Sequence, residues 1–94
     1  MSENIQLNVQ YTQFQNISIT FEYDGNTHIV HLSLLFMSPK TYEHFVNKEY
    51  LKFIESYMQD LYEVKVSNRE KYLKLLDIQY LYDYIYGQVY YPNI

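Results

Sequence analysis

The sequence contains no cysteine, no alanine and no tryptophan, and its only arginine is Arg69. Without cysteine, the 94-residue chain can form no disulfide, zinc–thiolate site, iron–sulfur cluster or thiol nucleophile, and a reducing compartment fits this composition. Two glycines and two prolines are too few for a collagen-like or low-complexity chain. The glycines, Gly25 and Gly87, also lie too far apart for a phosphate-binding loop or a dinucleotide fingerprint.

Basic charge and long apolar runs are scarce as well. Seven Lys and Arg against eleven Asp and Glu give a net charge of −4, so we expect no direct binding of nucleic acid. The N-terminus lacks a basic segment followed by an apolar one, so we expect no signal peptide. The longest apolar run is Leu34–Met37, whereas a membrane span needs about 20 residues. We therefore predict a cytoplasmic protein that does not bind membranes.

Hydrophobic residues make up 48% of the chain, with 13 tyrosines and 5 phenylalanines among them. This content and length predict one domain, residues 1–94, with a strand half at 1–37 and a helix half at 38–94. Residue types with A/T-rich codons are common, as in low-GC bacteria and their phages. If the gene belongs to a phage, the expected location is the host cytoplasm.

The first half alternates apolar and polar residues with period two, which is typical of half-buried strands. The alternation covers 5–11, 17–23 and 30–36, with turns at 13–16 and at Asp24-Gly25. A loop of four residues would place Tyr23 opposite His28 and Phe21 opposite Val30, and a two-residue Asp-Gly loop keeps the same faces. A three-residue loop would turn Ile29 and His31 onto the apolar face, so we reject it.

The second half predicts two helices that cover the apolar sheet face. Ser38 is a suitable N-cap with Pro39 at the first helical position, and an amphipathic pattern follows over 39–65, with a break conceivable near Asn47. Ser67 and Glu70 form a capping-box pattern at the start of a second helix, 68–86, which we expect Gly87 to end as its C-cap. Residues 78–86 also alternate like a strand, but we favour a helix. The fold class is α+β: a three-stranded antiparallel β-meander, about 5–36, followed by two α-helices packed on one face.

Catalytic and metal-binding patterns are weak. His28 and His31 are three residues apart on an expected strand, so they point to opposite faces, and His44 lies on a helix. No nucleophile-elbow motif is present. We therefore predict a protein that is not an enzyme, with no catalytic residue, no metal site and no cofactor.

Two groups of residues are candidates for binding a protein partner. The first is an acidic group toward the end of the first helix: Glu55, Asp60 and Glu63. The second is the C-terminal tyrosines: Tyr80, Tyr82, Tyr84, Tyr86, Tyr90 and Tyr91. On a helix, Tyr80 and Tyr84 share one stripe and Tyr82 and Tyr86 another, which we place about 40° away. Because one stripe suffices to pack on the sheet, we expect the remaining tyrosines to be exposed or to contact a partner. A bias toward A/T-rich codons alone is the competing explanation for the number of tyrosines.

The favoured hypothesis is a small non-enzymatic inhibitor of the phage-encoded anti-host or anti-defence type. It would occupy the surface of a protein partner, for example a nucleic-acid-processing complex, with tyrosines in pockets and carboxylates on basic residues. The alternative is a homo-oligomeric structural or accessory subunit, such as a homodimer, with the tyrosines buried between copies. A third hypothesis is a small ligand-binding protein or enzyme that uses His28 or His44.

Overall fold

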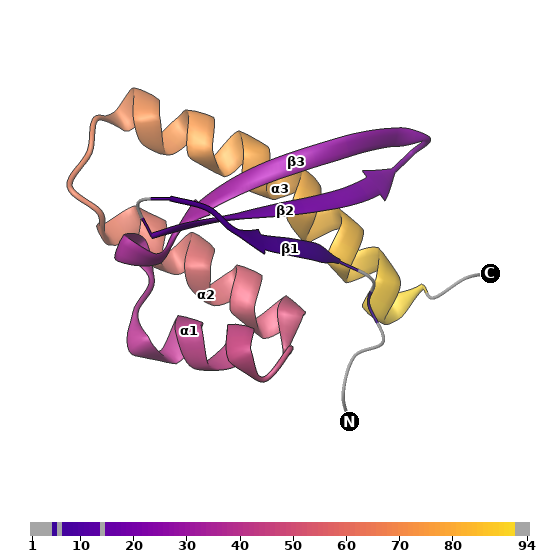
Figure 1. Cartoon of the computed structure of the whole chain (residues 1–94). Helices are drawn as coiled ribbons and strands as arrows, with labels where there is room; N and C mark the ends of the chain where they lie inside the picture. Colours follow the sequence, from indigo (N-terminus) through magenta and orange to yellow (C-terminus); the bar gives the residue numbers. More distant parts are fainter. Residues whose placement is uncertain (1–4, 6, 14, 92–94) are drawn as a thin grey trace.

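The computed structural model describes residues 5, 7–13 and 15–91. Three strands come first, β1 (Asn8–Tyr11), β2 (Asn16–Tyr23) and β3 (Asn26–Ser33), followed by a 3₁₀ turn, η1 (Leu34–Phe36). Three helices complete the chain: α1 (Pro39–Val46), α2 (Tyr50–Glu63) and α3 (Asn68–Tyr90). The strands form an antiparallel sheet in the order β1-β2-β3 (Figure 1). The α+β class and the meander are confirmed, but there are three helices rather than two.

The β2–β3 hairpin turns through two residues. Tyr23 pairs with Asn26, and Phe21 pairs with His28, so the pairing belongs to the two-residue loop rather than to the four-residue one. Asp24 and Gly25 have φ values of 56° and 78°, as a two-residue turn of the primed type requires. The predicted faces are confirmed, since Ile29 is 59% exposed on the outer side.

The first strand is shorter than its alternating pattern, and the third begins and ends earlier, at Asn26–Ser33 rather than 30–36. Regular pairing of the first strand covers Asn8–Tyr11 rather than 5–11. β3 ends at Ser33, whose hydroxyl accepts a hydrogen bond from the Leu35 amide at 3.2 Å and caps η1. The prediction of strand through residue 36 is therefore wrong: the 3₁₀ turn leaves Leu35 71% exposed. Alternation of apolar residues cannot detect such a local cap.

The helix predicted over 39–65 is interrupted, and the break lies where Asn47 suggested it. Lys48 adopts a left-handed φ of 58°. Its amide donates to the Phe45 carbonyl at 3.1 Å, and the next amide, that of Glu49, donates to the His44 carbonyl at 2.9 Å. These two bonds form a Schellman motif, which satisfies the last carbonyls of α1 and reverses the chain. At the other end of α1, the Ser38 hydroxyl accepts from the Thr41 amide at 3.2 Å, so the predicted N-cap is confirmed.

Helix α3 is longer than predicted. The Ser67 hydroxyl accepts from the Glu70 amide at 3.1 Å, which confirms the predicted start. The C-cap prediction for Gly87 is wrong, because the helix continues to Tyr90 and the Tyr91 amide donates to the Gly87 carbonyl at 2.7 Å. Val89 and Tyr90, which lie beyond the predicted helix end at residue 86, are helical. A lone glycine costs a helix only about 1 kcal/mol, so it does not by itself end one.

One core joins the sheet to the helices. It contains, from the sheet, Ile17, Ile19, Phe21, Val30 and Leu32, and from the helices, Phe45, Tyr50, Phe53, Ile54, Tyr57, Leu61, Ile78, Leu81 and Ile85. α2 packs between α1 and α3, and α3 runs behind the sheet in Figure 1. Among the residues that the structure describes, no helix is long and apolar enough to span a bilayer.

Candidate functional site

The buried side of α3 is narrow, and this decides where its tyrosines lie. Only Ile78, Leu81 and Ile85 of this helix are buried, at spacings of three and four residues. Residues two positions apart on a helix are rotated by about 200° relative to each other. The angle of about 40° that we expected between the two tyrosine stripes is therefore wrong. Tyr80 and Tyr84 face the β2–β3 hairpin, whereas Tyr82 and Tyr86 lie on the other side of the buried stripe. The structure therefore separates the tyrosines into two groups.

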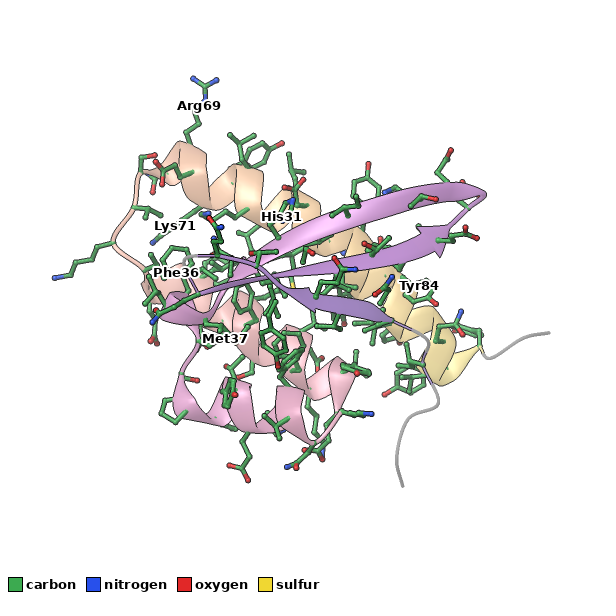
Figure 2. All side chains as sticks on the ribbon, in the orientation of Figure 1. His31, Phe36, Met37, Arg69, Lys71 and Tyr84 are labelled. Carbon is green, nitrogen blue, oxygen red and sulfur yellow. The ribbon has the colours of Figure 1, made fainter. Side chains whose placement is uncertain are left out.

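The first group, the hairpin cluster, consists of Tyr80, Tyr84, His28, Phe21 and Tyr23. The Tyr80 ring stacks on His28 with a centroid distance of 5.2 Å, and His28 stacks on Phe21 at 5.4 Å. Tyr84 (labelled in Figure 2) lies 5.0 Å from Phe21 and meets the Tyr23 ring edge-on at 6.4 Å. Offset and edge-on contacts of this kind favour aromatic packing. This cluster attaches α3 to the hairpin, and it is a structural use of two of the predicted binding tyrosines.

The second group, the tyrosine ladder, consists of Tyr82, Tyr86 and Tyr90. Their ring centroids follow each other at 5.9 Å and 4.5 Å, one helical turn apart. Tyr82 is partly buried against the core, but Tyr86 is 40% and Tyr90 57% exposed. Tyr91, at the C-cap, is 64% exposed and extends the same end of the helix. The ladder thus presents rings to solvent that already pack against one another.

Glu55 on α2 is the acidic residue that the fold brings to the ladder. The pKa of Tyr82 is raised, first by partial burial and then by the negative charge of Glu55 and by neighbouring groups, which include Tyr86 and Asp83. The phenol of Tyr82 therefore stays protonated at neutral pH and can donate a hydrogen bond. A carboxylate beside a row of phenols can attract a basic group to an aromatic surface.

Asp60 has partners inside the protein. Its Oδ2 accepts hydrogen bonds from the Ser38 amide at 2.9 Å and from the Thr41 hydroxyl at 2.5 Å. Thr41 is fully buried, and its hydroxyl also lies 2.6 Å from that of Ser56. Because Thr41 has one hydroxyl proton and gives it to the carboxylate, Ser56 is the donor to Thr41. Asp60 therefore joins α2 to the start of α1. Glu63 is exposed at the end of α2, so the acidic group divides into three separate places.

The histidines have contacts of their own. His28 lies between the rings of Phe21 and Tyr80, and His44 Nδ1 lies 3.1 Å from Glu49 Oε1. This hydrogen bond is the main reason why the pKa of Glu49 is lowered. His44 also lines a groove of about 510 Å³ between α1 and α2, together with Lys40, Lys52, Glu55, Ser56 and Gln59. Within the described part of the chain, no three His, Asp or Glu side chains gather as metal ligands.

Helix α3 has a second exposed face that was not predicted from the sequence. Tyr72, Leu73 and Leu76 are apolar positions of the helix, yet they are 63%, 50% and 44% exposed. The spacing of Ile78, Leu81 and Ile85 contained the signal for this face. Continued toward the N-terminus at about 100° per residue, the buried stripe leaves Tyr72, Leu76 and Tyr80 on the opposite side.

Comparison of the chain with models of protein families, with curated proteins and with solved structures finds no significant match.

Proposed function

We propose that this chain is a non-enzymatic protein-binding module that inhibits a partner by occupying its nucleic-acid-binding surface, as phage-encoded anti-host and anti-defence proteins do. The tyrosine ladder is the observation that carries the proposal. Tyr86 and Tyr90 expose large rings that lie 4.5 Å apart in a tilted contact, and Tyr86 also stacks on Tyr82. Such rings supply contact area at a small cost in side-chain entropy, which is why tyrosine is common among the residues that dominate binding energy.

The charge of the chain favours a basic partner. The net charge is −4, and Glu55 lies beside the ladder, where it acts on Tyr82. A surface that holds nucleic acid is rich in Lys and Arg and often carries aromatic or apolar pockets for bases. Rings of Tyr86 and Tyr90 would enter such pockets, while Glu55 would pair with a base-contacting or phosphate-contacting cation. Complementary charge would also steer the encounter and make it sensitive to salt.

The test is affinity capture from the native host's lysate, with and without nuclease treatment, followed by measurement of binding to the recovered partner. The double variant Tyr86→Ala/Tyr90→Ala should weaken that binding by at least about 30-fold, the effect of a central binding residue. The matched control is Tyr62→Ala on α2, where an equally exposed ring, at 60%, lies outside the ladder. Circular dichroism should show that both variants are folded.

Charge-reversal variants and a competition measurement identify the mode of action. Glu55→Lys should weaken binding and reduce its salt dependence, whereas Glu43→Lys on the exposed side of α1 should not. The captured partner should lose its own nucleic-acid binding in proportion to its occupancy by this protein. A partner retained only through nucleic acid, or one that binds the ladder variant as tightly as the wild type, contradicts the proposal.

A further inference from the structure

The exposed face of α3 opposite its buried stripe carries apolar residues in a symmetric order, with opposite charges at its two ends. Arg69, Tyr72, Leu76, Tyr80 and Asp83 follow each other at spacings of three, four, four and three residues. We name these five residues the α3 seam. From its centre, Leu76, each direction meets first a tyrosine and then a charge, positive at the N-terminal end and negative at the C-terminal end. At about 100° per residue, all five lie within a sector of roughly 80°.

The seam is accessible in the folded chain. Tyr72 is 63% and Leu76 44% exposed, and Arg69 and Asp83 are exposed too. Tyr80 stacks on His28 of the hairpin cluster with one side of its ring, yet it remains 51% exposed. Figure 2 shows the Arg69 guanidinium extended away from the first turn of α3. Asp83 is hydrogen-bonded to Gln79 at 2.9 Å, one turn back on its own helix, which leaves its second carboxylate oxygen for another donor.

We propose that the α3 seam binds a second copy of this chain, with the two α3 helices antiparallel about a two-fold axis at Leu76. In that arrangement Leu76 meets Leu76 of the second copy, Tyr72 meets its Tyr80, and Arg69 meets its Asp83. The Tyr72–Tyr80 and Arg69–Asp83 contacts each occur twice, as in an isologous interface. A parallel pairing would instead set Arg69 against Arg69 and Asp83 against Asp83. Charge complementarity therefore selects both the occupant and its direction.

The available area predicts a weak dimer. A buried aromatic side chain removes about 150–250 Å² from water, so the exposed parts of Tyr72, Leu73, Leu76 and Tyr80 amount to on the order of 400 Å² per chain. A standard stable complex buries about 800 Å² per partner. We therefore expect a dimer that forms reversibly as the concentration rises. This inference does not depend on the proposed function, because the ladder residues Tyr86 and Tyr90 lie beyond the seam.

The first experiment is sedimentation velocity of the purified full chain, without any partner, from about 10 µM to about 1 mM. The mass should rise from 11.5 kDa toward twice that value. Leu76→Arg and Arg69→Asp should each remain monomeric throughout this range, because they place like charges opposite each other. The double variant Arg69→Asp/Asp83→Arg restores both ion pairs with their signs exchanged, so it should regain the heavier species. Leu35→Arg, a change at an exposed leucine of η1, is the control and should dimerise like the wild type.

Cysteine cross-linking tests the direction, since the chain has no cysteine of its own. Helix axes 8–10 Å apart bring the two residues at position 76 within disulfide range, so Leu76→Cys should cross-link to itself. Two copies of Tyr72→Cys would be separated by about 12 Å along the axis, and that variant should cross-link only when mixed with Tyr80→Cys. Efficient self-linking of Tyr72→Cys would overturn the antiparallel arrangement. A wild type that stays monomeric at 1 mM, or a dimer that survives Leu76→Arg, would overturn the interface.

Discussion

Replacement of Asp60 by alanine tests the internal role that the structure gives to this carboxylate. Asp60 accepts hydrogen bonds from the Ser38 amide and the Thr41 hydroxyl, both at the start of α1. A hydrogen bond to a charged group contributes about 1.5–3 kcal/mol, and the half-buried position of Asp60 lets water replace part of it. The carboxylate also lies at the N-terminal end of α1, where the helix dipole favours negative charge. Together these terms predict that Asp60→Ala lowers the free energy of unfolding by about 2–4 kcal/mol.

Urea denaturation, extrapolated linearly to water, measures this loss. For a domain of this size, the same change should lower the melting temperature by roughly 10–20 °C. Asp60→Asn retains one oxygen acceptor without the charge, so its loss should be intermediate. The control is Glu63→Ala, one turn later on the same helix, where a carboxylate near the helix C-terminus is exposed; its effect should stay within about 0.5 kcal/mol. If Asp60→Ala is as mild as Glu63→Ala, the hydrogen-bond network does not stabilise the fold as argued.

Three further predictions concern pH and backbone conformation. Burial raises the pKa of Tyr57 above 10, so the unfolded chain loses this proton first. The free energy of unfolding therefore falls as the pH rises through 10. Urea titrations compared between about pH 8 and pH 11 should show a smaller loss of stability for Tyr57→Phe than for the wild type. Gly87 is helical, and a Cβ there would meet nothing within 4 Å. Gly87→Ala should therefore raise the melting temperature by an amount equivalent to about 0.5–1 kcal/mol. A lower melting temperature would mean that Gly87 does end the helix. Lys48 has a left-handed φ of 58°. In urea denaturation, Lys48→Gly should therefore raise the free energy of unfolding by a few tenths to about 1 kcal/mol. The control Lys40→Gly, in the regular first turn of α1, should lower it.

The strand half was predictable because a sheet face is a property of alternation. The residues that alternate over 17–23 and 30–36 include five of the core side chains, and Asp24-Gly25 adopts the positive φ values that a two-residue turn needs. What alternation could not detect is a change of backbone conformation that preserves the apolar pattern. Leu34 and Phe36 keep the spacing of the third strand's apolar residues, although Leu35 between them is apolar too, and the Ser33 hydroxyl caps Leu34–Phe36 as a 3₁₀ helix.

The helix half was less predictable because its ends depend on hydrogen bonds that have weak sequence signals. The helix starts at Ser38 and Ser67 were correct, since a serine hydroxyl is a specific acceptor for the free amides of a first turn. The end of α1 was harder, because a lysine occupies the left-handed position that usually holds glycine. At Gly87 the reverse holds: a residue typical of helix ends lies inside α3.

The candidate site shows the same limit at the level of side chains. Glu55, Asp60 and Glu63 are similar in sequence, but only the packing of α1 on α2 reveals that Asp60 is bound to Ser38 and Thr41. The tyrosines are likewise equivalent in sequence, and the packing assigns Tyr84 to the hairpin and Tyr86 to solvent. Burial is a property of the pair of surfaces in contact, so a single helix pattern cannot specify it when apolar residues occur on all sides.

Helix α3 is the part of the molecule where apolar surface exceeds what the core requires. Three of its residues are buried, whereas Tyr72, Leu73, Leu76, Tyr80, Tyr86 and Tyr90 are all at least 40% exposed. A bias toward A/T-rich codons would account for tyrosine rather than tryptophan, but not for an order that places Arg69 and Asp83 at equal distances from Leu76. It would not account either for a ladder in which Tyr86 packs against Tyr90. Isolated exposed rings are common on protein surfaces, whereas two ordered rows on one helix are expected where a surface is covered by another protein. The two rows differ in symmetry, and for this reason we propose a second copy of the chain as the partner of the seam and a different protein as the partner of the ladder.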